Sequence, residues 1–408
     1  MTEILKGVKV VEIAQFFFVP CAGALLSDWG ADVIKIEHPV RGDTQRGFIT
    51  IGGMRVDPQV NPMLEHPNRG KRSVGVDISS QEGQEVIYEM VKDADVFLTN
   101  YLPAARQKNR IDLEHIRAIN PNIIYARGSA YGDKGPDRER GGFDGTAFWS
   151  HSGIAQAMTP EECEVPLMCS IAGFGDSISG MNLAGGVVGA LLHRDRTGEA
   201  LEVDVSLLSS AWWAAGAAIN THNHIGKLMP NSMPKAGGSA VNPFLGNYLT
   251  SDGGTISLFI LAPGAFIGDT FAHLGIAEAA NDPRFCEARA LMANAGPAAA
   301  LITQAIVSRP FAYWRDHLRT MKGQWAAAQT FLDLATDIQA LANDMFTEVE
   351  PITGGDPIKI VRGPIQYNHR KLETTRSPQA SEHTELVLLE MGMEWSRVEQ
   401  LKSTGTIA

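Results

Sequence analysis

Short runs rich in β-branched residues alternate with helical stretches over the first third of the sequence. Residues 8–13 (VKVVEI) and 32–37 (DVIKIE) are strand-like, and residues 21–28 between them place small and apolar side chains at helical spacing. The same alternation continues through residues 73–77, 81–92, 95–99, 111–119 and 122–127. Strands joined through a helix by short links run parallel. The chain is therefore predicted to contain a doubly wound α/β domain around a parallel sheet.

The sequence has 408 residues, which is more than one compact core of ordinary size accommodates. Its composition changes over residues 221–246, where Asn, Pro, Gly, Ser and His dominate. We predict a linker there, followed by a smaller α+β domain with an early turn at residues 251–254. The predicted division is a large domain at residues 1–220, the linker at 221–246, a small domain at 247–341 and a C-terminal segment at 342–408.

Charge and cysteine content argue against several classes of protein. With 35 Lys and Arg against 46 Asp and Glu, the formal net charge is −11, which argues against a nucleic-acid-binding protein. The 4 cysteines form no Cys-x-x-Cys pair, so we expect reduced thiols in a cytoplasmic protein, and no metal site. We expect neither a signal peptide nor a membrane segment, because no apolar run reaches about 20 residues.

Residues 14–20 (AQFFFVP) join the first predicted strand to the first helix, where dinucleotide-binding proteins carry glycines. Bulky phenylalanines there argue against an NAD or FAD site, and the sequence has neither a G-x-x-x-x-G-K-[ST] loop nor a G-x-S-x-G elbow. These phenylalanines are expected in the core or, because they follow a strand, in the wall of a substrate pocket. Trp212 and Trp213 are expected in the core.

Asp176 lies among small residues in the block 175–181 (GDSISGM), at the start of a long apolar helix predicted over residues 176–193. One interpretation is structural: an aspartate at a helix N-cap accepts hydrogen bonds from backbone N–H groups of the first turn. The other is catalytic. A carboxylate at a helix N-terminus stays ionised, and small neighbours allow a thioester carbonyl to approach it. The residues alone leave both interpretations open.

Several blocks occur in an order that is specific to one family: residues 26–37 (LSDWGADVIKIE), 68–73 (NRGKRS), 100–103 (NYLP), 175–181 (GDSISGM) and 196–198 (RTG). Over nearly its full length the chain resembles the family III CoA-transferases, which include formyl-CoA:oxalate and carnitine CoA-transferases. The resemblance implies a Rossmann-like large domain built from N- and C-terminal parts, with the small domain between them. It also implies a homodimer of two interlocked, ring-like subunits.

The resemblance further implies a covalent mechanism in which Asp176 is the nucleophile. An acyl-CoA donor and a carboxylic acid acceptor would react in turn, through an aspartyl mixed anhydride and an aspartyl-CoA thioester. Coenzyme A would be part of the substrate, and no permanently bound cofactor is implied. By the same resemblance, the residues near coenzyme A are His38, Lys71, Arg72, Asn100 and Lys108.

Two departures from related enzymes bear on the acyl group. Phe17 stands where formyl-CoA transferases have Gln, and Phe143 stands where the racemases of this superfamily have an acid/base His. We therefore expect a bulky or apolar acyl group. The residues expected around the substrate are Gln15, Phe16, Phe17, Phe48, Phe143, Asp144 and Trp149. Two alternatives stay open: an α-methylacyl-CoA racemase-like isomerase, and a CoA-binding protein without turnover in which Asp176 is only a helix cap.

Overall fold

The computed structural model describes residues 3–51, 54–56, 61–352 and 354–408. The chain divides into two compact units, Met1–Asn231 with Leu341–Ala408, and Ser232–Ala340. Within the described ranges, no helix is both long enough and apolar enough to span a membrane.

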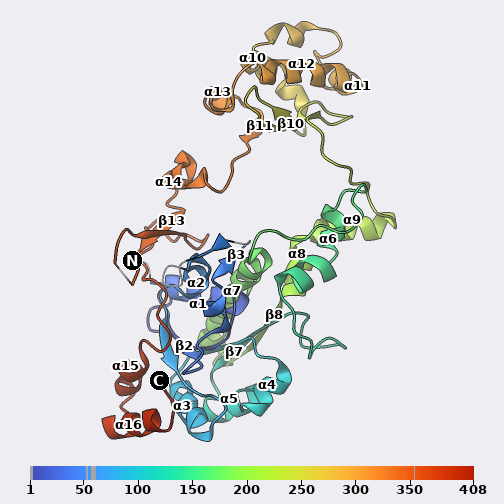
Figure 1. The fold of residues 1–408 in the computed structure, drawn as a ribbon. Coiled ribbons are helices and arrows are strands. Elements are labelled where there is room, and N and C mark those ends of the chain that lie inside the picture. The colour runs from blue at the N-terminus through green and yellow to red at the C-terminus, as the bar shows by residue number, and fades with distance from the viewer. Residues whose placement is uncertain (1–2, 52–53, 57–60, 353) are drawn as a thin grey trace. The chain divides into compact units, whose positions relative to one another are not determined.

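A sheet of 6 strands forms the centre of the first unit, in the order β5-β2-β1-β6-β7-β8 (Figure 1). Every neighbouring pair in it is parallel, so the parallel sheet predicted from the alternation of strand and helix is confirmed. The strands are β1 (Lys9–Ile13), β2 (Asp32–Glu37), β5 (Arg72–Gly75), β6 (Val96–Thr99), β7 (Ile124–Ser129) and β8 (Glu202–Ser206).

Helices cover both faces of this sheet. Side chains along a strand alternate between the faces, so Val10 packs in one core and its neighbour Val11 in the other. The first core receives α1 (Phe18–Asp28), α7 (Phe174–Thr197) and α8 (Leu207–Ala214). The second receives α3 (Gln81–Lys92), α5 (Leu113–Ile119) and the C-terminal helices α15 (Thr384–Glu390) and α16 (Trp395–Ser403), which Figure 1 shows beside α3.

Shorter elements complete the first unit. They are β3 (Thr50–Ile51), β4 (Met54–Arg55), α2 (Pro62–Asn68), α4 (Pro103–Lys108), the π-helical turn η2 (Asp144–His151), α6 (Ile154–Met158), α9 (Gly216–Ile225), β13 (Phe346–Val349) and β14 (Ile358–Val361), together with the 3₁₀ turn η1 (Thr44–Gly47). Residues 221–225, expected in the linker, continue helix α9 instead.

Trp212 and Trp213 do not lie in the core. They are 54% and 85% exposed at the end of α8, and α9 has no buried residue. Their apolar character is the reason for expecting both tryptophans in the core. Apolar composition alone does not distinguish a residue of the core from one in an exposed apolar patch.

The second unit is an antiparallel sheet packed with helices. Its strand order is β12-β11-β10-β9, and β10 and β11 form a hairpin around the turn at Gly253. Its core includes Tyr248, Phe271 and Trp314. The strands are β9 (Gly237–Gly238), β10 (Leu245–Leu249), β11 (Thr255–Phe259) and β12 (Trp325–Ala327). The helices are α10 (Ile267–His273), α11 (Ala288–Ala293), α12 (Ala295–Val307) and α13 (Phe311–His317), followed by α14 (Ile338–Ala342) where the units join. The remaining 3₁₀ turns are η3 (Pro263–Ala265), η4 (Ala277–Asn281), η5 (Leu318–Thr320) and η6 (Leu334–Thr336).

Candidate active site

Asp176 is the third residue of α7, and the helix N-cap is Gly173, which has a φ of 68° and no side chain to cap with. The interpretation of Asp176 as the N-cap is therefore wrong. Another carboxylate reaches the helix end instead: Asp144 Oδ2 accepts a hydrogen bond from the N–H of Gly175 at 3.0 Å.

Glycines of the 175–181 block allow close packing at this helix end. A Cβ on Gly175 would lie 2.2 Å from Cγ of Phe148 and 2.5 Å from Oδ1 of Asp144. A Cβ on Gly180 would lie 2.7 Å from that of Cys21 on α1. These positions fix the start of α7 against η2 and α1, and thereby fix the position of Asp176.

The Asp176 carboxylate is poorly solvated. Burial raises its pKa to about 7, and the nearby Asp144 carboxylate adds to the rise. Nowhere in the described part of the chain does a donor hydrogen-bond to this carboxylate or a cation pair with it. Near neutral pH it is therefore partly ionised, and its ionised form is more basic and less solvated than an ordinary aspartate.

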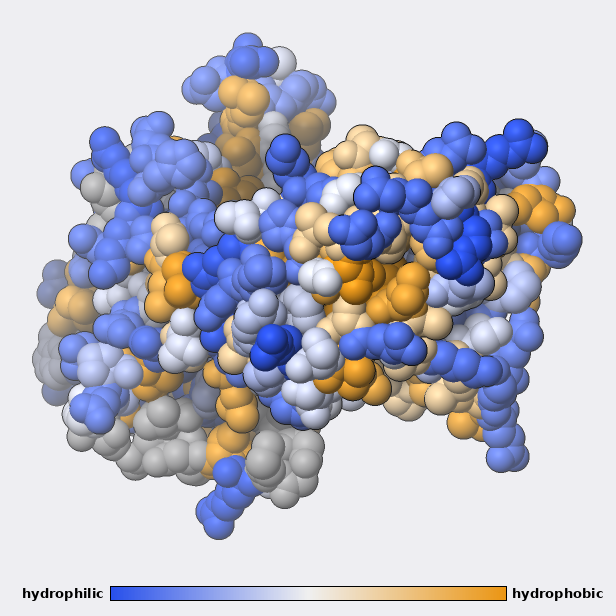
Figure 2. All heavy atoms as spheres, turned by 90° about the horizontal axis from the view of Figure 1, so that it is seen from above, coloured by the Kyte–Doolittle hydropathy of each residue, from blue (hydrophilic) through white to orange (hydrophobic). Residues whose placement is uncertain are grey.

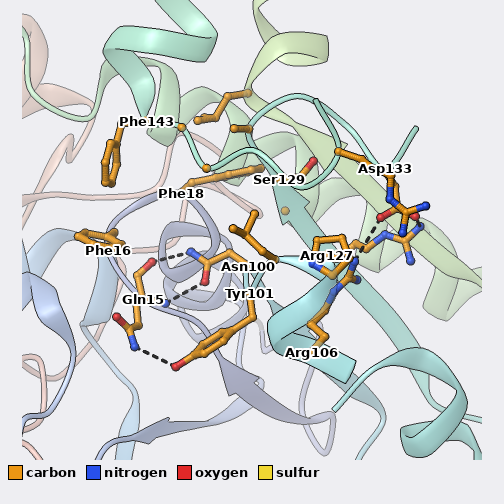
Figure 3. A pocket seen from close by; sticks show the side chains of 18 of the residues that line it. Gln15, Phe16, Phe18, Asn100, Tyr101, Arg106, Arg127, Ser129, Asp133 and Phe143 are labelled. Carbon is orange, nitrogen blue, oxygen red and sulfur yellow. Dashed lines mark hydrogen bonds and ion pairs between the residues drawn. The ribbon is translucent and has the colours of Figure 1, made fainter. Parts of the chain in front are cut away.

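Asp176 lines a cavity of about 310 Å³ at the carboxyl ends of β1, β6 and β7. Its wall includes four of the other predicted residues: Gln15, Phe16, Asn100 and Phe143. Figure 3 shows Phe16 and Phe143 on one side of this cavity, with Arg106, Arg127 and Asp133 on the other.

One side of the cavity is aromatic. The ring centroids of Phe16 and Phe143 are 5.2 Å apart in an edge-to-face arrangement, and Phe48 lies 6.2 Å from Phe16. Phe18 and Leu207 add further apolar surface to the wall. This side can take up an alkyl or aromatic group.

The opposite side is charged, but its charges are largely paired with each other. Arg106 and Arg127 both bind Asp133, with N···O distances of 3.2 and 3.1 Å. Arg127 also pairs with Glu202 and Asp204, both at 2.9 Å.

Four residues expected around the substrate lie outside the cavity wall: Phe17, Phe48, Asp144 and Trp149. Phe48 packs against Phe16, which does line the cavity. Phe17 is buried and stacks on His66, with ring centroids 5.5 Å apart. Trp149 Nε1 donates a hydrogen bond to the carbonyl of Leu167 at 2.6 Å. Asp144 is 8% exposed and acts on the cavity through Asp176 and the start of α7.

A second cavity, of about 410 Å³, lies next to the first and shares Gln15 and Tyr101 with it. His38 lines this second cavity at the end of β2. Lys108, on the last turn of α4, is exposed and lines neither cavity.

Lys71 and Arg72, expected near coenzyme A, line neither cavity and are paired with other side chains of the protein. Lys71 is 3% exposed, and its ammonium donates to Glu12, Asn68 and the Pro20 carbonyl at 2.7–3.3 Å, which uses all of its N–H groups. Arg72 pairs with Asp32 and Glu390, both at 2.5 Å. A lysine or arginine in a sequence block does not reveal whether its charge faces solvent or an internal partner.

Several residues in the cavity walls were not singled out from the sequence. Among them, Tyr101 lines both cavities, Arg106 lines the first, and Arg41 lines the second. Two of these positions carried a signal. Tyr101 and Arg41 follow the carboxyl end of a predicted strand by a few residues, which is where ligands bind in parallel α/β sheets.

Comparisons with known proteins agree with this geometry. The model of CoA-transferase family III matches residues 5–384. A cinnamoyl-CoA:phenyllactate CoA-transferase from Clostridium sporogenes is 31% identical, over 98% of this chain and 96% of its own length. A (R)-2-hydroxy-4-methylpentanoate CoA-transferase from Clostridioides difficile is 30% identical, over 99% of both chains.

A solved structure has the same fold. The crystal structure of a CAIB/BAIF family protein from Brucella suis matches with a TM-score of 0.79 and 29% identity, over 95% of this chain and 99% of that one. The family resemblance of the sequence blocks is thereby confirmed, and the chain belongs to CoA-transferase family III.

Proposed function

We propose that this enzyme moves coenzyme A from a bulky, apolar acyl-CoA to a carboxylic acid, with Asp176 as the covalent nucleophile. The observation that carries the proposal is the Asp176 carboxylate itself. It lies in the wall of a cavity, its pKa is raised to about 7 by burial and by Asp144, and neighbouring glycines leave room around it. Poor solvation makes a carboxylate a better nucleophile toward a thioester.

In the first half of the reaction, an Asp176 oxygen attacks the thioester carbonyl carbon. The C–S bond breaks, and CoA leaves as a thiolate while an acyl-aspartyl anhydride forms. The thiolate then attacks the aspartyl carbonyl carbon of that anhydride. The donor acid leaves as a carboxylate, and an aspartyl-CoA thioester remains.

The second half repeats these steps in reverse with the acceptor acid. The acceptor carboxylate attacks the aspartyl thioester, CoA thiolate leaves, and the thiolate attacks the acyl carbonyl of the new anhydride. The new acyl-CoA departs and Asp176 is again a carboxylate. Neither half takes up or releases a proton overall, so the site needs no general acid.

The N-terminus of α1 is suited to stabilise the oxyanion of each tetrahedral intermediate. Phe17 at its N-cap supplies no side-chain hydrogen bond, and Phe18 at its first turn lines the cavity with Asp176. Backbone N–H groups at a helix N-terminus carry partial positive charge and favour developing negative charge.

The aromatic side of the cavity supports the proposed acyl group. Burying an alkyl or aromatic chain against Phe16 and Phe143 stabilises binding by roughly 25 cal/mol per Å². The two relatives above are named for cinnamoyl-CoA with phenyllactate and for 2-hydroxy-4-methylpentanoate, compounds with an aromatic ring or a branched chain. We propose aromatic and branched-chain acyl groups of similar size as the substrates.

For coenzyme A itself, we propose that it extends across both cavities. The thioester would lie beside Asp176, and the nucleotide would lie in the second cavity near His38 and Arg41. Coenzyme A would then pass Gln15 and Tyr101, which line both cavities and are joined by a hydrogen bond of 2.9 Å.

An isomerase would need a second acid/base group across the substrate from Asp176. Phe143 lines the cavity where the racemases have His, and a phenyl ring cannot transfer a proton. Among the described residues that line this cavity there is no histidine. Transfer is therefore the better supported activity.

We also propose that the enzyme is a homodimer. Apolar side chains gather on α8, on α9 and just beyond: Trp212, Trp213, Ile225, Leu228 and Met229 are between 45% and 85% exposed. Hydrophobic residues are visible among hydrophilic ones on the surface in Figure 2. Apolar surface of this extent is typical of a subunit interface, and it accords with the interlocked dimer that the family resemblance implies.

The covalent step is tested by trapping. Wild-type enzyme incubated with 3-phenylpropanoyl-CoA is treated with hydroxylamine, which converts an aspartyl thioester or anhydride to a hydroxamate, and the peptide containing Asp176 is analysed by mass spectrometry. We expect the hydroxamate on Asp176, and loss of at least about 100-fold in transfer for Asp176→Asn. Asp195→Asn, on the last turns of the same helix, serves as control and should keep its activity. Full activity of Asp176→Asn would refute the proposal.

A further inference from the structure

Phe16 has a backbone conformation that few side chains adopt. Its φ is 66°, in the left-handed region, where a bulky aromatic residue is an outlier. The residue lies in the connection between β1 and α1, and its ring lines the cavity that contains Asp176. A strained residue at a candidate active site persists only where its surroundings hold it in place.

The first support is the side chain of Asn100, which follows β6. Its Oδ1 accepts a hydrogen bond from the N–H of Gln15 at 3.1 Å, and its Nδ2 donates to the carbonyl of the same residue at 2.6 Å. Figure 3 shows this pair of bonds. One amide side chain therefore occupies both backbone groups of the residue before Phe16. The side chain of Asn100 therefore holds the loop that contains Phe16.

The second support is Asp43, whose Oδ1 accepts a hydrogen bond from the N–H of Phe16 at 3.1 Å. Asp43 is 2% exposed and is held in turn by Lys35, with an N···O distance of 2.8 Å. Lys35 also binds Glu12 of β1 at 3.2 Å. The strained residue is thus tied to a buried ion-pair network that joins β1, β2 and the loop after β2.

Loss of these hydrogen bonds would affect the position of the Phe16 ring. A rotation of φ to the usual negative range would turn its side chain away from its present partners, Phe143 at 5.2 Å and Phe48 at 6.2 Å. The aromatic side of the cavity would then lose its central member.

We infer that Asn100 and Asp43 are positioning residues that hold Phe16 in its left-handed conformation, and that the ring so placed determines which acyl groups the enzyme prefers. This inference rests on the proposed transferase function and extends it. The hydrogen bonds of Asn100 and Asp43 to this loop have no part in the chemical step itself. Their loss should therefore change the preference among acyl groups more than the rate of transfer.

The test compares kcat/KM for 3-phenylpropanoyl-CoA and for acetyl-CoA, each with 4-methylpentanoate as acceptor, in Asn100→Ala, Phe16→Ala and the double variant. For Asn100→Ala we expect the ratio of the two values to fall about 10-fold, close to that of Phe16→Ala. The double variant should show no further fall, because Asn100 acts through the Phe16 ring.

Asn120→Ala is the matched control. Asn120 also holds a turn through its amide, with Nδ2 donating to the carbonyls of Val91 and Ala94 at 2.9 and 2.8 Å, but it lines neither cavity. Its substitution should lower stability and leave the ratio unchanged. Should Asn100→Ala fail to fold, Asn100→Asp keeps the shape and the acceptor oxygen, loses the donor, and should shift the ratio in the same direction.

An equal fall for both substrates, or effects that add in the double variant, would overturn the inference. Those outcomes leave the transferase function intact, because the wild-type enzyme still forms product. The absence of product from the wild-type enzyme with either donor would overturn the proposed substrate class and the inference with it.

Discussion

Asp144 and Asp176 are neighbouring carboxylates, the first buried and the second half-buried, with different surroundings. Burial raises the pKa of each, but backbone N–H groups of Gly175 and Phe174 partly offset the rise for Asp144. No such donor reaches Asp176 among the residues whose positions are described. The pair therefore divides into a carboxylate that is hydrogen-bonded and holds the helix end, and one that is exposed to the cavity and free to react.

This difference predicts a pH dependence of transfer. The attacking form of Asp176 is the carboxylate, so kcat/KM should rise with pH, with its midpoint near pH 7, and level off only where the group is fully ionised. Asp144→Asn removes the neighbouring negative charge and keeps an acceptor for the Gly175 N–H. We expect this variant to move the midpoint to lower pH. A midpoint that stays in place would mean that Asp144 does not act on Asp176 electrostatically, and Asp195→Asn serves as the control that should not move it.

The same pKa predicts an effect on stability. Asp176 has a pKa of about 7 in the folded protein and an ordinary value of 3.8 in the unfolded chain, so folding takes up a proton between these values. Its contribution to stability therefore falls as pH rises through this window. Asp176→Asn removes the buried charge and should raise the free energy of unfolding by roughly 1–4 kcal/mol at pH 8, with little change at pH 4. Denaturant titrations at the two pH values measure this, and equal effects at both would contradict it.

At the scale of elements, the first turn of α7 is the most tightly packed part of the site. Gly175→Ala would place a methyl group 2.2 Å from Phe148 and 2.5 Å from Asp144, so the helix end must shift. We expect a loss of about 1–3 kcal/mol in stability and of roughly 100-fold in kcat. The control is Gly185→Ala on the same helix, where a Cβ meets nothing within 4 Å. That variant should keep its activity, and equal activity of the two variants would show that the close packing at Gly175 is not needed.

The strands and helices of the first unit were predictable because their signals are local. The strand-helix-strand pattern of residues 8–13, 21–28 and 32–37 spans only 30 residues of sequence. It predicts the parallel pairing of β1 with β2 that the structure has. The catalytic candidate Asp176 was found by resemblance of a short block. The sequence could not show that Gly173, and not Asp176, occupies the helix N-cap, because that depends on where the helix begins.

Features that depend on distant partners were missed. Lys71 is buried because Glu12, 59 positions earlier, lies beside it in the fold. Phe16 is strained because Asn100, whose bonds span 85 positions, holds the residue before it. Phe16 and Phe17 were both expected beside the substrate, but of the two only Phe16 lines the cavity, while Phe17 stacks on His66. No local pattern of residue types contains this information.

At the scale of the whole molecule, the proposed dimer predicts a mass. Light scattering should give twice the chain mass of 44.1 kDa, and interlocked subunits should keep that mass on dilution to nanomolar concentration. Trp213, 85% exposed in the single chain, should be shielded from iodide quenching in the dimer. A folded, active monomer would contradict the proposal.

The buried network of Glu12, Lys35, Asp43 and Lys71 limits which single substitutions the fold tolerates. Removing one member leaves a buried charge without its partner, at a cost of about 3–5 kcal/mol. Since a domain is stable by only about 5–15 kcal/mol, these positions must change together or not at all. Phe143, 60% exposed at the aromatic side of the cavity, has no such tie and can be replaced singly. Substitution of Phe143 alone is therefore expected to change the acyl preference, whereas a single substitution within the buried network is expected to destabilise the fold.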